Sequence, residues 1–165
     1  MTGRTLASLV LLAITMSSCS DDDADANGVH AADVLSAAIR DVVAEQPVPT
    51  DSEEYKPVVF VVGVGENGIE AGVQAEVATA LRDDIDVRFA DAREEPIDSG
   101  AEDEPVLDDG VLLLVSDVPE SGNPVEMSVE IYRSLSDWTK AIFTITVADD
   151  SWSVTATSLV ALDAP

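Results

Sequence analysis

The sequence predicts an α+β domain in which two helices pack on a mostly antiparallel sheet that ends in a C-terminal β-meander. Apolar residues recur at helical spacing in two segments of the first half of the chain, and they alternate with polar residues in the last third. The change of period from about 3.6 to 2 separates amphipathic helices from half-buried strands. A run of strands that follows the last helix is typical of α+β folds.

Two segments carry the helical pattern. The first helix is expected from Val29 to Glu45, with Asn27 as its N-cap and with Pro47 and Pro49 beyond its end. The second is expected from Ile69 to Arg82. The predicted apolar faces consist of Val34, Leu35, Ala38, Ile39, Val42 and Val43 in the first helix and Ile69, Val73, Val77, Ala80 and Leu81 in the second.

Six segments have the composition of strands: 57–62, 85–89, 110–115, 125–131, 138–147 and 152–160. The continuous apolar run 110–115 is typical of a central strand. The last three segments alternate and are separated by turns at 134–137 and 148–151, which predicts the meander.

Residues 91–110 interrupt this pattern with nine acidic residues, one arginine and two prolines. We expect a surface loop, and loops of this length without secondary structure are usually functional or disordered. Clustered carboxylates repel one another until a cation neutralises them. The loop is therefore a candidate for diffuse binding of calcium or other cations.

The N-terminus has a basic residue, an apolar run from Leu6 to Met16 and then Ser17, Ser18 and Cys19. This order predicts a secretory signal, and the run is too short for a membrane-spanning helix, which needs about 20 residues. The segment resembles the lipobox of bacterial lipoproteins, with Met16 where that family usually has leucine. The resemblance implies that residues 1–18 are a cleaved signal peptide and that Cys19 becomes the lipidated first residue. A signal peptide with ordinary cleavage is the alternative.

Residues 19–28 are small and acidic, and we expect a flexible tether between the lipid and a single domain over 29–165. The resemblance implies a lipid-anchored protein of the cell envelope, bound to the membrane through Cys19. The serine at position 20 implies the periplasmic face of the outer membrane if the host is Gram-negative.

The chain has 33 acidic and 8 basic side chains, for a net charge of −25. Nucleic acid is excluded as a partner, because it binds through the neutralisation of its phosphates by basic groups. The surface of an anionic membrane is disfavoured for the same reason, so the lipid rather than charge has to hold the protein there.

A buried strand runs into Gly63, Gly65 and Gly68, which fit the G-x-G-x-x-G pattern of a dinucleotide-binding turn, and Asp91 follows at about the distance of a ribose-binding acid. A dinucleotide-binding fold needs further strand–helix units, and after Phe89 the chain offers a loop and a meander. We interpret the glycines as a structural turn and expect no cofactor.

Asp23, Asp25 and Asn27 fit the first half of a calcium loop, with Gly28 at its sixth position. The twelfth position, which should hold a bidentate glutamate, is Val34. These three residues are weak metal candidates, and the acidic tether is the favoured interpretation.

The only histidine, His30, and the only cysteine, Cys19, leave no nucleophile–base pair. The protein is predicted not to be an enzyme. Its predicted role is that of a small acidic envelope lipoprotein with a non-catalytic binding or scaffolding function and a possible envelope protein partner. A cation- or calcium-binding or sensory module is the alternative, and a carboxylate-dependent hydrolase is third.

Four aromatic residues, Tyr132, Trp138, Phe143 and Trp152, fall in the C-terminal strands. Large aromatics usually pack inside small sheets. Trp138 and Phe143 have opposite parity, so one strand is expected to present an aromatic on each face. Trp138 or Trp152, if exposed, is the candidate partner surface, because aromatic residues anchor interfaces.

Overall fold

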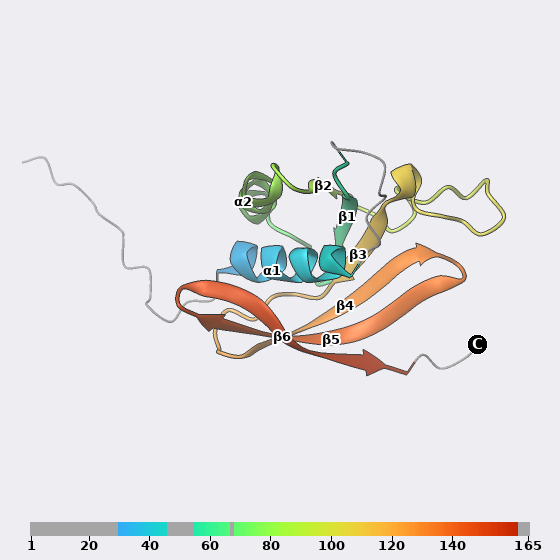
Figure 1. Ribbon diagram of the computed structural model, residues 1–165. Coiled ribbons are helices and arrows are strands. Elements are labelled where there is room, and N and C mark those ends of the chain that lie inside the picture. Colours follow the sequence, from blue (N-terminus) through green and yellow to red (C-terminus); the bar gives the residue numbers. More distant parts are fainter. Residues whose placement is uncertain (1–29, 46–54, 67, 162–165) are drawn as a thin grey trace, which may run out of the picture.

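The computed structural model describes residues 30–45, 55–66 and 68–161. In this part of the chain, two helices lie on one face of a six-stranded sheet (Figure 1). The elements in chain order are α1 (Ala31–Ala44), β1 (Val58–Gly63), α2 (Ala71–Leu81), β2 (Asp86–Phe89), the short 3-10 helix η1 (Leu107–Asp109), β3 (Val111–Val115), β4 (Val125–Ser134), β5 (Asp137–Ala148) and β6 (Ser151–Val160). The predicted α+β class and its closing meander are confirmed.

The strands lie in the order β2-β1-β3-β4-β5-β6. β1 is parallel to both β2 and β3, with Val61 opposite Phe89 and Phe60 opposite Leu112. Every pair from β3 to β6 is antiparallel. β1 is therefore flanked by two parallel strands. The chain passes from β1 through α2 to β2 on one side of β1, and β3 then pairs with the other side of β1.

The helix α1 lies between α2 and the strands β5 and β6 (Figure 1). Its predicted apolar face is buried except for the half-buried Val43, but burial extends further round the helix than one face, because both α2 and the sheet cover it. Its buried residues are Ala32, Val34, Leu35, Ser36, Ala37, Ala38, Ile39 and Val42.

The prediction of Asn27 as the N-cap of α1 is wrong. His30 has the extended backbone of an N-cap, and its carbonyl oxygen accepts from the backbone N–H groups of Asp33 and Val34. Helical periodicity marks which residues face the core, whereas the exact first turn depends on backbone bonds that it does not encode. Asn27 itself lies outside the described residues, as do Pro47 and Pro49.

The apolar face of α2 is narrower than predicted. Val77 and Leu81, four positions apart on one side, are buried, whereas Ile69 and Val73 are only partly buried. Ala80, expected on the same face, is exposed. The helix packs mainly on the short strand β2 and on α1. Residues at the edges of its apolar face are therefore exposed to solvent.

The apolar side chains form two clusters on opposite faces of the sheet. The larger lies under the helices and takes its strand residues from β1, β3, β4 and β5. The smaller contains Phe60, Val62, Val106, Leu112, Leu114 and Tyr132. Strand β3 is buried along its whole length because it contributes to both clusters.

The acidic loop 91–110 covers the smaller cluster. Val106 is buried in this cluster, and Ile97 packs against it and forms an isolated antiparallel bridge with Val106. Pro96 of the loop is also buried. Two backbone bonds join the loop to the end of β4 and the following turn, from the N–H of Val106 to the oxygen of Arg133 and from that of Leu135 to the oxygen of Asp103. The loop is an ordered cover for the sheet.

The predicted signal peptide, the lipidation site Cys19 and the tether lie outside the described residues. Neither helix in residues 30–45, 55–66 and 68–161 combines the length and the apolar character that crossing a membrane requires.

Candidate functional site

A cavity of about 530 Å³ lies at the carboxyl ends of the parallel strands β1 and β3. Gly63 and Val115 end these two strands at the cavity, and Ala31 and Glu70 bring the beginnings of α1 and α2 to its wall. Ligands of open sheets with parallel strands usually bind at such an edge. The remaining lining residues are Leu35, Gly68, Ile69, Val73, Ser116, Asp117, Val118, Pro119 and Glu120.

The glycine turn packs closely against its surroundings. A Cβ atom at Gly63 would lie 2.9 Å from the backbone of Gly68 and Ile69, and one at Gly65 would lie 1.7 Å from a carboxylate oxygen of Asp117. The N–H of Val64 continues the sheet by donating to the oxygen of Val115 at 2.9 Å. The backbone contacts account for Gly63 without a bound phosphate, whereas the exposed Asp117 side chain beside Gly65 can move aside.

The charged residues of the cavity are Glu70, Asp117 and Glu120. Helix N-termini carry partial positive charge, so the carboxylates complement the ends of α1 and α2, but they repel a pyrophosphate. Asp91 lines an adjoining cavity of about 150 Å³, which shares Gly63, Gly68 and Ile69 with the first. The arrangement favours a cation with an apolar body over a nucleotide.

The described acidic residues do not gather into a metal site. Over 30–45, 55–66 and 68–161, no group of three or more His, Cys, Asp or Glu residues is placed to hold a metal ion. In the acidic loop, Asp108 pairs with Arg88, and Asp103 accepts from Ser136 Oγ at 2.6 Å. The weak calcium candidates Asp23, Asp25 and Asn27 lie outside the described residues.

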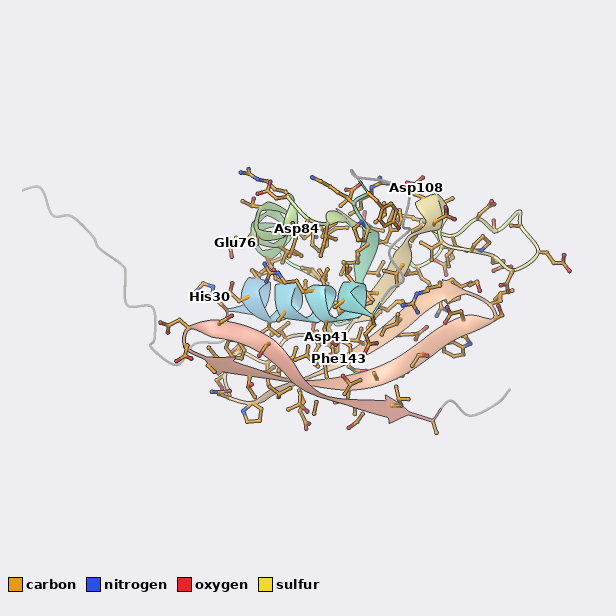
Figure 2. All side chains as sticks on the ribbon, in the orientation of Figure 1. His30, Asp41, Glu76, Asp84, Asp108 and Phe143 are labelled. Atoms are coloured by element: carbon orange, nitrogen blue, oxygen red, sulfur yellow. The ribbon has the colours of Figure 1, made fainter. Side chains whose placement is uncertain are left out.

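Two arginines beside the smaller cluster each form an ion pair with a carboxylate and lie over an aromatic ring. Arg93 pairs with Glu130 at 2.7 Å and lies 5.1 Å from the ring centre of Tyr132. Arg88 pairs with Asp86 at 2.7 Å and lies 5.4 Å from the ring centre of Phe60. His30, the only histidine, is exposed at the start of α1 (Figure 2).

The aromatic residues divide between the two faces of the sheet. Phe143 is buried beneath α1 (Figure 2), and Trp152 is partly buried against the same cluster. Tyr132 is buried on the other face. Trp138, opposite Tyr132 in the register of β4 and β5, is 40% exposed. The predicted opposite parity of Trp138 and Phe143 is confirmed.

We call the side of β4, β5 and β6 that faces away from the helices the outer face. Neither helix lies on it (Figure 1). Ile142 is 38% exposed there, four residues along β5 from Trp138. Its cross-strand neighbours are Ser128 on β4 and Ser158 on β6. Of the two candidate tryptophans, Trp138 therefore lies on the exposed outer face, and Trp152 packs on the larger cluster on the helix side.

Two functional candidates were not foreseen from the sequence. Glu70 precedes α2, whereas Asp117 and Glu120 lie in the connection between β3 and β4, and only the fold brings them to one cavity. Among the described residues, β6 is one of the two edge strands of the sheet, and its Leu159 is 74% exposed. A signal for that edge was present, because residues 151–160 contain no charged residue in a chain with 25% charged residues.

Comparison with protein-family models, with curated proteins and with solved structures found no match for this chain.

Proposed function

We propose that the protein is a non-catalytic binding module of the cell envelope, held at the membrane by lipid on Cys19, that binds a partner protein on the outer face of β4–β6. The observation that carries this proposal is the exposure of Trp138 and Ile142 on that face. Tryptophan is among the residues that contribute most to interface energies. Burial of both side chains by a partner would remove apolar area from water on an otherwise acidic protein.

The arrangement around Trp138 supports a preformed surface. Its neighbour Tyr132 is buried and hydrogen-bonded to the backbone of Glu104, and Arg93 lies against the ring of Tyr132. A rigid support lowers the entropy lost when a partner binds. The outer face therefore needs little rearrangement to accept a protein.

The test is site-specific photo-crosslinking in the native host with tagged full-length protein. Benzoylphenylalanine replaces Ile142 on the outer face in one strain and exposed Thr79 on α2 in another. We expect one predominant crosslinked partner from position 142 and none from position 79. Trp138→Ser in the position-142 strain should reduce the yield by about tenfold, as expected for an interface anchor worth more than 1 kcal/mol.

Equal crosslinking from both positions, or none from position 142, would contradict binding on the outer face. A Cys19→Ser version examines the anchor separately. It should leave the membrane fraction, and continued fractionation with membranes would contradict lipidation at Cys19.

A second candidate function, the binding of a small organic cation, is favoured by the acidic cavity. The cavity has apolar walls from Leu35, Ile69 and Val73, and its charged residues are all carboxylates. A cation that binds only the folded state raises the melting temperature. Benzylamine should do so, whereas its neutral isostere benzyl alcohol should not, and Asp117→Asn should abolish the difference. Calcium chloride in the same assay tests the calcium alternative.

A further inference from the structure

The two edges of the sheet differ in length and charge. The edge strand β2 has four residues, and its Arg88 pairs with Asp86 and Asp108. The opposite edge strand, β6, has ten residues and contains neither a charged residue nor a proline. Charges, prolines and short length are the usual means by which proteins prevent strands from pairing at an edge. β2 is protected by its short length and its charges, whereas the only such feature of β6 is the interruption of its pairing near Thr155.

The second half of β6 is regular and open. A register shift near Thr155 interrupts the pairing with β5, and after it Ala156 to Val160 pair continuously with Thr144 to Lys140. In the described part of the chain no element lies beyond β6. Leu159 lies opposite the fully buried Ala141 and is nevertheless 74% exposed. A further strand would place a side chain beside Leu159 and satisfy the outward backbone groups of β6.

We infer that the edge of β6 binds an extended, basic segment of a partner protein by strand addition. This inference rests on the proposed function and names the class of partner and its mode of attachment. Main-chain hydrogen bonds to an exposed edge supply affinity in such complexes, and alternate side chains supply specificity. At about 3.3 Å per residue, a segment of roughly ten residues spans β6 from end to end, and five of them lie beside the regular stretch Ala156 to Val160.

Charge determines which occupant fits. The chain carries a net charge of −25, and the exposed Asp149 and Asp150 lie in the turn where β6 begins. A second copy of the chain would bring an equal negative charge to the edge, whereas a basic segment is attracted over about a Debye length. Lysines or arginines at one end of the segment would lie near Asp149 and Asp150.

The direct test uses a fluorescent ten-residue peptide of alternating valine and threonine that ends with two lysines, which antiparallel addition to β6 would place near Asp149 and Asp150. Binding to the tagged full-length protein is measured by anisotropy. We expect saturable binding that weakens as salt rises. A version N-methylated at every second residue keeps the charge but loses the hydrogen-bond donors of one edge. It should bind about tenfold or more weakly, because strand addition depends on those donors. Equal binding of the two peptides, or no binding of the first, would overturn strand addition.

Two protein variants provide a matched pair. Leu159→Lys and Thr79→Lys each add one positive charge, the first on the β6 edge and the second on the exposed side of α2. A charge on an edge strand blocks pairing, so only Leu159→Lys should weaken peptide binding by about tenfold. Equal weakening by both would show that general charge, not the edge, governs binding.

The same variants distinguish this inference from the proposed function. If Leu159→Lys retains the partner crosslinked from position 142, the outer face binds without strand addition and the inference is wrong. If position 142 captures nothing in the unsubstituted protein, the proposed function itself fails. Light scattering completes the test, because a dimer that Leu159→Lys dissociates would identify a second copy as the occupant and overturn the basic partner.

Discussion

The hydroxyl of Tyr132 donates a hydrogen bond of 2.9 Å to the backbone oxygen of Glu104, joining the interior of the sheet to the acidic loop. The tyrosine ring belongs to the smaller apolar cluster, and Val106 of the loop packs in the same cluster. A segment with nine carboxylates is thus joined to the interior of the sheet through a buried aromatic residue.

The first prediction concerns this bond. Tyr132→Phe keeps the ring and removes the hydroxyl, so it should lower the free energy of unfolding by about 0.5–1.5 kcal/mol, the usual net contribution of a hydrogen bond. Urea unfolding followed by tryptophan fluorescence measures the change. Tyr55→Phe, at an exposed position, is the control and should have almost no effect. An equal loss in both variants would contradict the role assigned to the Tyr132 hydroxyl.

A second prediction uses the acid sensitivity of the loop. Hydrogen bonds from Ser136, and then from Ser134, hold the pKa of Asp103 below its ordinary value. The ionised carboxylate therefore stabilises the fold above the ordinary pKa near 3.8, and this contribution is lost as pH falls through the lowered pKa.

Asp103→Asn should remove that part of the acid dependence, measured as melting temperature from pH 6 to pH 2. Glu102→Gln removes a neighbouring charge at an exposed position and should retain the dependence. Parallel pH profiles for Asp103→Asn and the unsubstituted protein would refute the assignment.

A third prediction has the opposite sign. Burial, and next the charge of Glu45, raise the pKa of Asp41 on α1. The folded state then binds the proton more tightly than the unfolded state, so stability rises as pH falls through the raised pKa toward 3.8. Asp41→Asn should raise the melting temperature at pH 7 and lose this advantage in acid. Asp33→Asn, in the first turn of α1, removes a charge favourable to the helix dipole and should not stabilise the protein.

A fourth prediction separates two glycines. A Cβ at Gly72 in α2 would meet no atom within 4 Å, so Gly72→Ala should stabilise the protein by about 0.5 kcal/mol through a smaller loss of chain entropy. Gly65→Ala should destabilise it slightly, because the new Cβ would push aside the exposed carboxylate of Asp117. Adding Asp117→Ala should restore part of the loss in thermal melts. No restoration would mean that another contact requires glycine at position 65.

Local sequence patterns predicted where the helices and strands lie along the chain better than they predicted which strands pair with one another. Alternation over 125–131 predicted a strand, and Val125, Met127 and Val129 of β4 are buried. The unbroken apolar run 110–115 predicted the central strand β3. An alternating pattern indicates a strand buried on one face, and a continuous apolar run indicates a strand buried on both faces. Each pattern can be read from the side chains of the segment itself. The parallel pairing of β1 with β2 and β3 is a relation between distant segments, and no local period encodes it.

For the candidate surfaces too, local patterns predicted single residues but not the surroundings that the fold gives them. The parity of Trp138 and Phe143 predicted an aromatic on each face of β5, which the structure confirms. Parity alone did not indicate which face the helices leave uncovered. The open edge at Leu159 depends on strand order, and the acidic cavity depends on where β1, β3 and both helices end. These sites arise from tertiary arrangement and not from a contiguous motif.

The packing of α1 against β6 also constrains how the chain folds. Residues near position 35 need a surface supplied by residues beyond position 150, and contacts so distant in sequence form slowly because a long loop must close first. Until the last strand has been synthesised, α1 keeps an apolar side facing water. A chain exported in extended form would therefore acquire its native helix packing only after residue 160 has crossed the membrane.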